Sequence, residues 1–297
     1  MHDEILDCLV IGGGAAGLTA AVYLGRYRRR AVLIDDGGSR IARIPKARNV
    51  IGFPDGIAGP ELLERMRLHA GRYGTTLELG RVERLERTAG GRFEARAGSR
   101  RLEARTVLLA TGATDIEPEI PGLAPALKAG VVRYCPICDG YETQGQRVAV
   151  LGRQQHGLRE AVFVAGFDNR VTWLALGTRD TLPAEELERL RRAGVTVEDR
   201  EPRAIRCGPR QVLVELAGGQ TLEFDTLYPA LGLVHACGLA TALGARARPD
   251  GQLEVDEHYE TTVPGLYAAG DVAVDLNQIN VAAGQAAIAA TAIHNRL

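Results

Sequence analysis

The 297-residue chain lacks an apolar run long enough to cross a bilayer, and its formal net charge is only -1. A spanning helix needs about 20 mostly apolar residues, whereas the apolar runs here contain glycine or end in polar residues. The balanced charge provides no positive field to hold nucleic acid or an anionic membrane. The sequence also opens without a basic segment and cleavable apolar stretch, so we expect a cytoplasmic protein with no membrane or nucleic-acid partner.

Cysteine is scarce, with five residues scattered along the chain. An odd, scattered set is not a disulfide framework. In a reducing compartment, a lone close pair such as Cys135 and Cys138 is typical of catalysis rather than of a structural disulfide. A zinc site would need about four ligands, but the sequence has no second CxxC and no histidine pair at finger spacing. We therefore expect no metal site, and we assign Cys8, within an apolar run, to the core.

A glycine-rich loop with the spacing G-x-G-x-x-G follows the apolar segment 5–11 and precedes a predicted helix. This strand–loop–helix context is what a dinucleotide fingerprint requires. The glycines allow a tight turn and close approach of a pyrophosphate, and the helix N-terminus offers N–H groups to it. An acidic residue at the end of the next strand, about 20 residues on, can accept ribose hydroxyls. The residues that this fingerprint assigns to the dinucleotide are Gly12, Gly14, Ala15, Ala16, Gly17 and Asp35.

The Cys135-Pro136-Ile137-Cys138 segment has a spacing that permits disulfide geometry in a tight turn. We expect it to precede or open a helix, since Pro136 suits a first helical turn and a helix N-terminus favours a thiolate. A thiolate can attack a disulfide, pass through a mixed disulfide and be resolved by its partner. Asp139 follows at once and can carry a proton to the leaving thiol. The segment therefore predicts thiol–disulfide exchange.

Three later features indicate which dinucleotide the first loop binds. A Thr-Gly pair after a buried strand, a Gly-Asp-Val segment near the end, and the CxxC motif together resemble the low-molecular-weight thioredoxin reductases, over essentially the whole chain. The resemblance implies FAD in the first glycine loop, with the Gly-Asp pair contacting it and the following helix facing the flavin. It assigns contacts with FAD to Asn49, Thr111, Gly112, Gly270, Asp271 and Gln278. Gln278 follows Asn277, where the family usually has arginine.

The same resemblance assigns roles in the exchange reaction. It implies that Cys138 faces the flavin, that Cys135 attacks the disulfide of the partner, and that Asp139 is the acid–base group. It also implies a homodimer whose partner is a thioredoxin-like protein or a small dithiol or disulfide. Two readings of other classes stay open: a flavin and disulfide redox sensor without multiple turnover, and a flavoprotein with structural cysteines.

A second glycine motif, near residue 152, departs from the family pattern. Gly152 and Gly157 are present, but the middle position is Gln154, where a pyrophosphate needs unobstructed backbone. The next strand also ends without the basic cluster that would bind the 2′-phosphate of NADPH. Both departures argue against NADPH, and relatives with such a loss take electrons from ferredoxin or give them to oxygen. The alternative is a conventional NADPH-dependent thioredoxin reductase, with a rearranged loop that binds through Arg153 or Arg179.

The order of segments predicts an α/β fold with two doubly wound, Rossmann-like domains, one inserted in the other. The FAD-binding domain combines residues 1–115 with 232–297. The inserted NAD(P)-binding-like domain, 116–231, carries the CxxC pair. The segment 113–125, with three prolines, is predicted as a connector. Helices are predicted over 15–27, 60–73, 157–167, 184–193 and 282–295. Alternating segments at 92–97 and 101–105 predict an antiparallel meander that leads into a buried strand from Val107, and short strands are predicted near 195–198, 212–216 and 222–230.

Overall fold

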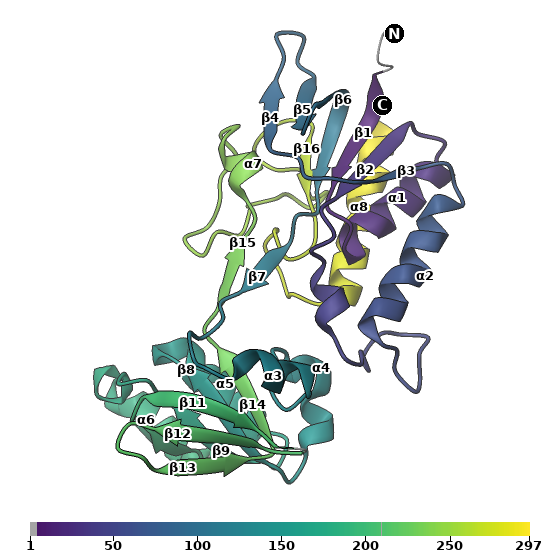
Figure 1. Cartoon of the computed structure of the whole chain (residues 1–297). Coiled ribbons are helices and arrows are strands. Elements are labelled where there is room, and N and C mark those ends of the chain that lie inside the picture. Colours follow the sequence, from purple (N-terminus) through teal and green to yellow (C-terminus); the bar gives the residue numbers. More distant parts are fainter. Residues whose placement is uncertain (1–4, 209) are drawn as a thin grey trace. The chain divides into compact units, whose positions relative to one another are not determined.

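The computed structural model in Figure 1 describes residues 5–208 and 210–297. The chain forms two compact units by its internal contacts. The first runs to Thr114 and resumes as Val234–Leu297, and the second comprises Asp115–Leu233. Within the described residues, no helix is both long and apolar enough to cross a membrane.

The first unit is built on a seven-stranded sheet in the order β3-β2-β1-β6-β5-β4, with β16 paired to β6. Its strands are β1 (Leu6–Ile11), β2 (Ala31–Asp35), β3 (Thr76–Leu79), β4 (Arg84–Arg87), β5 (Phe93–Ala97), β6 (Arg100–Leu109) and β16 (Leu266–Ala268). Strands β3, β2, β1, β6 and β16 run parallel, so their carboxyl ends share one edge. Ligands of doubly wound sheets bind at that edge.

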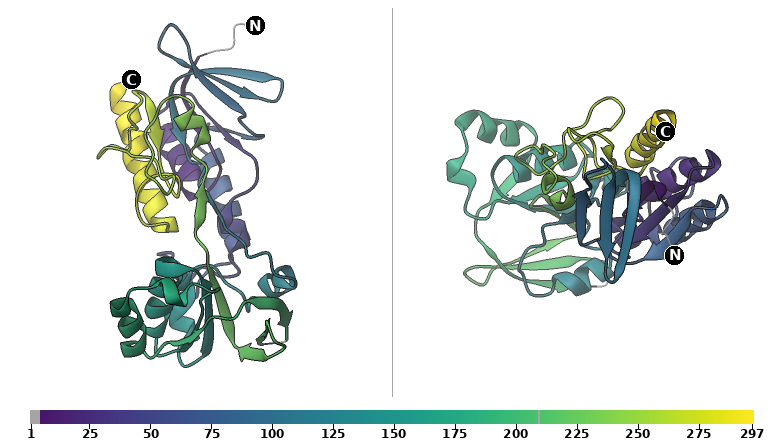
Figure 2. Two further views of the ribbon diagram at one scale, coloured as in Figure 1. Left: turned by 90° about the vertical axis from the view of Figure 1, so that its left-hand side faces the viewer. Right: turned by 90° about the horizontal axis from the view of Figure 1, so that it is seen from above.

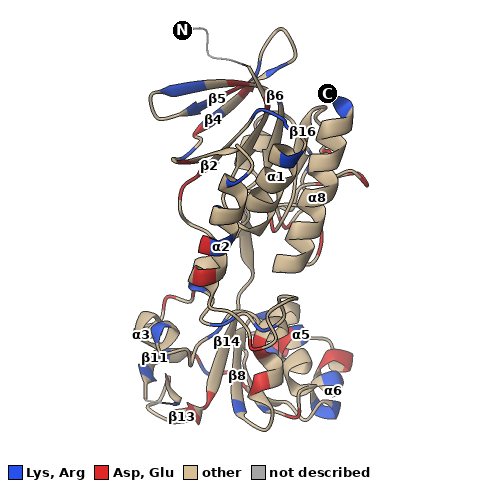
Figure 3. Ribbon diagram, turned by 90° about the vertical axis from the view of Figure 1, so that its right-hand side faces the viewer, with Lys and Arg blue, Asp and Glu red and all other residues tan. Residues whose placement is uncertain are grey.

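Alternate residues of the central strands enter two cores. Cys8 and Val10 pack with α1 (Ala15–Arg26), α2 (Gly59–Gly71) and α8 (Ile279–Arg296). Their neighbours Leu9 and Ile11 enter the opposite core, which includes residues of β4, β5 and the short α7 (Gly238–Thr241). A strand that is buried on both faces needs a continuous apolar run, and residues 8–11 of β1 provide one. Helices α1 and α8 pack on each other and are almost free of charged residues, as Figures 2 and 3 show.

The strand β6 differs from the sequence prediction. We expected one strand of an antiparallel meander at 101–105 and a separate buried strand from Val107, but Arg100–Leu109 is continuous. Its first half pairs antiparallel with β5, and its second half pairs parallel with β1 and β16. The residue pattern changes from alternating to fully apolar because the strand passes from a half-exposed margin into the covered sheet. The predicted connector 113–125 also contains the short strand β7 (Ala113–Asp115), which pairs with β15 (Leu233–His235).

The second unit contains a parallel sheet, β10-β9-β8-β14, and an antiparallel sheet, β11-β12-β13. Its strands are β8 (Arg147–Gly152), β9 (Arg170–Leu174), β10 (Thr196–Glu198), β11 (Pro202–Cys207), β12 (Val212–Leu216), β13 (Thr221–Phe224) and β14 (Thr226–Ala230). Helices α5 (Gln154–Ala165) and α6 (Ala184–Arg192) cover one face of the parallel sheet around Trp173. The other core joins the parallel sheet to the antiparallel sheet and to α3 (Leu123–Lys128). The single strand predicted over 222–230 is wrong, since β13 and β14 belong to different sheets.

Two glycines of the second unit are required by packing alone. A Cβ on Gly152 would lie 2.5 Å from the Ala230 carbonyl oxygen, and one on Gly157 would lie 2.6 Å from Nε1 of Trp173. The same indole nitrogen donates a hydrogen bond to the Gly152 carbonyl at 2.9 Å. Helix α5 therefore approaches β8 so closely that neither position tolerates a side chain, whether or not a ligand binds.

Two substitutions in this loop are expected to change stability differently. Gly157→Ala should lower the free energy of unfolding by about 1–3 kcal/mol, because it overpacks a filled contact. Gln154→Gly should leave the free energy of unfolding unchanged or raise it by up to about 1 kcal/mol. Gln154 has a φ of 47°, a left-handed conformation that is strained for any residue except glycine. Urea unfolding followed by fluorescence of Trp173, the only tryptophan in the chain, measures both. Equal effects of the two changes would contradict this account.

Candidate active site

The cysteine pair lies in the second unit, at the start of α4 (Pro136–Asp139). The two sulfurs form a disulfide, with a Cα–Cα distance of 5.3 Å. Cys135 is the N-cap and Pro136 occupies the first helical position, where a missing N–H costs no helical hydrogen bond. The N–H of Cys138 donates to the Cys135 carbonyl at 2.9 Å and closes the turn. The prediction that this segment opens a helix is confirmed, and Cys8, fully buried in β1, is a core residue as expected.

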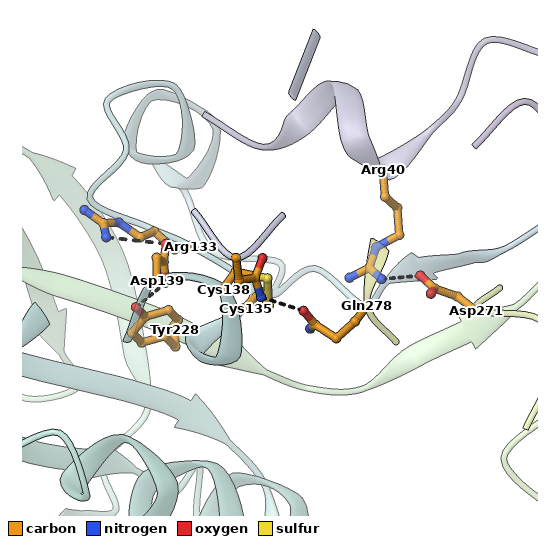
Figure 4. Close-up of a disulfide and its surroundings, with 9 residues drawn as sticks. Arg40, Arg133, Cys135, Cys138, Asp139, Tyr228, Asp271 and Gln278 are labelled. Atoms are coloured by element: carbon orange, nitrogen blue, oxygen red, sulfur yellow. Dashed lines mark hydrogen bonds and ion pairs between the residues drawn. A yellow bond between two sulfur atoms is a disulfide. The ribbon is translucent and has the colours of Figure 1, made fainter. Parts of the chain in front are cut away.

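Asp139 has two partners that the sequence did not reveal. Its Oδ1 accepts a hydrogen bond from the Tyr228 hydroxyl at 2.6 Å, and its Oδ2 lies 3.4 Å from Nη1 of Arg133 (Figure 4). Burial raises the pKa of the Asp139 carboxyl, while the bond from Tyr228 and the charge of Arg133 act to lower it. Burial and the adjacent carboxylate also raise the pKa of Tyr228, so its hydroxyl keeps its proton and is the donor. No local motif marks Tyr228, which is 89 residues away in the chain.

A cavity of about 840 Å³ lies in the first unit, beside the carboxyl ends of β1, β2 and β6. Gly12 of the glycine loop, Asp36 and Thr111 line it, together with residues 80–87. Gly112 follows Thr111, with a φ of 68°. Of the predicted fingerprint residues, Gly12 lines this cavity, which lies at the edge of the sheet where doubly wound folds bind their ligands.

The glycine loop fits a dinucleotide by the pattern of its close contacts. If Gly12 carried a Cβ, that atom would lie 2.2 Å from the carbonyl oxygen of Ala110. If Gly17 carried one, it would lie 1.8 Å from the carbonyl oxygen of Gly12. On Gly14, by contrast, the only described atom within 4 Å would be Oγ of Ser39, at 3.6 Å. Protein packing therefore requires Gly12 and Gly17 but not Gly14, and a ligand close to the backbone accounts for Gly14.

The helix that follows this loop suits an anion. Ala15 and Ala16 open α1, which is described in full and has neither a side-chain cap nor an acidic residue in its first turn. Its first N–H groups therefore point toward the loop without a side-chain acceptor, which is the arrangement that binds pyrophosphate.

The structure places Asp35 against the glycine loop. Its Oδ1 accepts hydrogen bonds from the N–H groups of Gly13 at 3.1 Å and Gly37 at 3.2 Å, and its Oδ2 pairs with Arg67 at 3.1 Å. These bonds fix the loop to the end of β2. Of the two acidic residues at the end of β2, it is Asp36 that lines the cavity, and the spacing rule did not single it out.

The predicted FAD contacts near the C-terminus form a hydrogen-bonded group. The N–H of Gly270 donates to Oε1 of Gln285 at 2.7 Å, which anchors the turn to α8. Asp271 pairs with Nη1 of Arg40 at 2.7 Å (Figure 4), and its carbonyl oxygen lies 2.6 Å from Nδ1 of His235. Arg40, at the start of the short helical turn Arg40–Arg43, was not predicted, because its partner lies 231 residues away in the chain.

Asn49 and Gln278, predicted from separate stretches, meet in the structure. Nδ2 of Asn49 donates to Oε1 of Gln278 at 2.9 Å, and Nδ2 of Asn280 donates to the Asn49 carbonyl at 2.8 Å. The loop is thereby tied to the start of α8. These amide groups offer the neutral donors and acceptors that an isoalloxazine edge requires.

The glycine loop of the second unit differs in detail. The N–H of Gln154 already donates to Oγ1 of Thr178 at 3.0 Å, and that hydroxyl donates to the Ala175 carbonyl at 2.5 Å. Nε2 of Gln155 donates to Oε1 of Glu186 at 2.9 Å. Helix α5 begins at Gln154, three positions before the predicted start, so the substituted position belongs to the helix N-terminus itself.

Comparison with known proteins gives the class to which these two sites belong. The model of the pyridine nucleotide-disulphide oxidoreductase family matches residues 6–286, and the chain belongs to that family. Within it the chain is a flavin-dependent disulfide oxidoreductase of the thioredoxin reductase type. It is 30% identical to a thioredoxin reductase of Bacillus subtilis, over 99% of this chain and 95% of the relative.

Solved structures extend the likeness to the fold. The structure of HlmI superposes with a TM-score of 0.92 at 31% identity, covering 100% of this chain and 93% of HlmI. A thioredoxin reductase of Streptococcus pyogenes has a TM-score of 0.89 at 27% identity, covering 99% and 98%. The predictions of an α/β fold with two Rossmann-like units and of a flavin-dependent enzyme are confirmed.

Gly14→Ala is expected to lower the FAD content without unfolding the protein. The added methyl meets only Ser39 in the protein, and the backbone at Gly14, with φ of -81°, admits any residue, but the methyl occupies the space a pyrophosphate needs. Flavin absorbance per chain after reconstitution measures binding, and circular dichroism of the apoprotein measures folding. Full FAD occupancy in the variant would refute the assignment of this loop.

Proposed function

We propose that the chain exchanges electrons between FAD and a partner dithiol or disulfide through Cys135 and Cys138, without accepting hydride from NADPH. The observation that carries this proposal is the hydrogen bond from the Gln154 N–H to Oγ1 of Thr178. A pyrophosphate at this helix N-terminus would need that N–H as a donor. In the second unit the Thr178 side chain therefore accepts the hydrogen bond that the Gln154 N–H would otherwise donate to a nicotinamide dinucleotide.

The two glycine loops of this chain support the proposal by contrast. In each, the first and third glycines are demanded by protein packing, so their presence says nothing about a ligand. Only the middle position distinguishes the loops: it is Gly14 in the first, where packing would admit a methyl group, and Gln154 in the second. The glycine that only a ligand requires is thus present in one loop and absent from the other. Arg153 and Arg179 are the basic residues near the second loop. Their side chains do not replace the Gln154 N–H, which is already bonded to Thr178.

The exchange chemistry follows from the cysteine turn. In one direction, a substrate dithiol attacks the Cys135–Cys138 disulfide, and a second attack releases the oxidised substrate and leaves two protein thiols. One S–S bond breaks and one forms, and each proton lost by an attacking thiol is regained by a released thiolate. We assign the exchange with the substrate to Cys135, which is attacked in this direction and attacks the partner's disulfide in the reverse one. We assign the flavin-facing role to Cys138 and proton transfer to Asp139. Bound FAD would supply a two-electron carrier between the cysteine pair and a second partner.

The similarity to enzymes named thioredoxin reductase favours a thioredoxin-like protein as the dithiol or disulfide partner, and a small dithiol fits the same chemistry. At the flavin we propose ferredoxin as donor or oxygen as acceptor in place of NADPH. We further propose that the protein acts in the cytoplasm as a homodimer.

We expect that anaerobic NADPH leaves the flavin oxidised, whereas dithiothreitol bleaches it, because only the dithiol route has an intact site. Absorbance titration of the FAD-loaded protein measures both. Subsequent admission of air tests oxygen: rapid reoxidation with one hydrogen peroxide formed per flavin indicates oxygen as acceptor. Slow reoxidation argues against oxygen, and reduction of the flavin by reduced ferredoxin then tests ferredoxin as donor. Stoichiometric bleaching by NADPH would overturn the proposal in favour of a conventional NADPH-dependent thioredoxin reductase.

Turnover is expected to require both cysteines. Cys135→Ser and Cys138→Ser should each reduce multiple-turnover dithiol oxidation to background, since a single thiol cannot complete the exchange. Cys207→Ser is the matched control, because Cys207 is exposed and outside the disulfide, and it should keep full activity. Turnover that survives loss of either active cysteine would indicate structural cysteines, and flavin reduction limited to one turnover in the unmodified protein would indicate a sensor.

A further inference from the structure

We infer that Tyr228 is a positioning residue for the exchange reaction, acting through Asp139 by orienting its carboxylate and donating a hydrogen bond to it beside the cysteine pair. The inference rests on the proposed function, in which Asp139 transfers the proton. Tyr228 lies in β14, with less than 2% of the residue exposed, and its hydroxyl is 2.6 Å from Oδ1 of Asp139 (Figure 4). A hydroxyl held by a rigid strand fixes the orientation of a carboxylate on a helix of only four residues.

Each oxygen of the carboxylate has its own donor. Tyr228 bonds Oδ1, and Arg133 lies 3.4 Å from Oδ2 while its Nε donates to the Gly130 carbonyl at 2.9 Å. The second bond directs the guanidinium toward Asp139 rather than toward solvent. Hydrogen bonds to a carboxylate from a phenol and a guanidinium stabilise its charged form and oppose the effect of burial.

The groups that act on Asp139 include one of like charge. Tyr228 and Arg133 favour the carboxylate, whereas burial and the negative charge of Glu142, in the turn Gly140–Thr143, favour the protonated acid. Proton transfer in both directions requires that neither form dominate strongly near the working pH. The phenol of Tyr228 supplies a donor that a phenylalanine of the same shape would lack.

The proposed reaction uses both the ionised and the protonated form of Asp139. When a substrate thiol attacks the disulfide, the ionised Asp139 takes the thiol proton, and the protonated Asp139 returns it to the sulfur that is released. No proton is gained or lost overall, and Tyr228 keeps its own proton throughout. Removing the Tyr228 hydroxyl should therefore shift the pH at which Asp139 ionises, without removing a reacting group.

The test is the pH dependence of disulfide reduction in the FAD-loaded protein. The protein is mixed anaerobically with dithiothreitol, and the rate of flavin bleaching is measured at each pH. The inflection in this pH–rate profile that is absent from Asp139→Asn is assigned to the ionisation of Asp139. In Tyr228→Phe that inflection should move by about one pH unit to higher pH, as expected for losing one hydrogen bond to a charged group. Tyr267→Phe, a buried strand tyrosine of the first unit, should leave it in place.

A double variant tests whether Tyr228 acts through Asp139. Tyr228→Phe should change the rate of the Asp139→Asn protein less than twofold, because the partner is already gone. An unmoved inflection in Tyr228→Phe, or a large effect that persists in the double variant, would overturn the inference. If Tyr228→Phe does not fold, as judged by Trp173 fluorescence, Arg133→Gln carries the test and should move the inflection in the same direction.

The outcomes separate this inference from the proposed function. Identical profiles for the unmodified protein and Asp139→Asn would remove Asp139 from the reaction, and the role of Tyr228 with it. Reduction of the flavin by NADPH would overturn only the proposal about the flavin's partner, since dithiothreitol reaches the cysteine pair independently.

Discussion

The close approach of a helix to the strand before it, without an intervening side chain, is the constraint on which both units depend. In the first unit, the backbones of Gly12 and Gly17 lie so near their neighbours that a Cβ on Gly17 would be 1.8 Å from a carbonyl oxygen. In the second, Gly152 and Gly157 make the equivalent contact, sealed by the indole of Trp173. This contact sets the position of each helix N-terminus, and hence what the N-terminus can bind.

Because packing uses the first and third glycines, a glycine motif combines two separate requirements. One is structural and survives without a ligand, and the other belongs to the ligand alone. The first loop meets both, with Gly14 open and the N–H groups of α1 free of side-chain caps. In the second loop the two glycines meet the structural requirement, while Gln154 adopts a left-handed conformation and its N–H is bonded to Thr178. The structural requirement is thus met without a glycine at the middle position.

In the proposed exchange site, a short local turn provides the two sulfurs, and the proposed proton carrier, Asp139, has a partner from a distant part of the sequence. Cys135 and Cys138 need only one helical turn and a proline to meet. Asp139 is adjacent to them in sequence, but its partners come from before the turn and from β14. Burial and like charge raise the pKa of the carboxyl, and the two donors oppose them. The cysteine pair and Asp139 are thus neighbours in the sequence, whereas Tyr228, which acts to lower the pKa of Asp139, reaches it only through the tertiary fold.

Local patterns in the sequence determined the α/β fold, the helix that opens at Pro136, the first glycine loop between strand and helix, and the altered loop at Gln154, because each depends on residues within a few positions of one another. Tertiary structure alone decided that β6 crosses from an antiparallel to a parallel neighbourhood and that residues 222–230 divide between two sheets. It likewise decided that Asp35 binds the glycine loop while Asp36 lines the cavity. It also decided the pairing of Arg40 with Asp271 and of Tyr228 with Asp139. These pairings carry no periodicity or spacing, since they join side chains that the chain brings together only after its strands are ordered in a sheet.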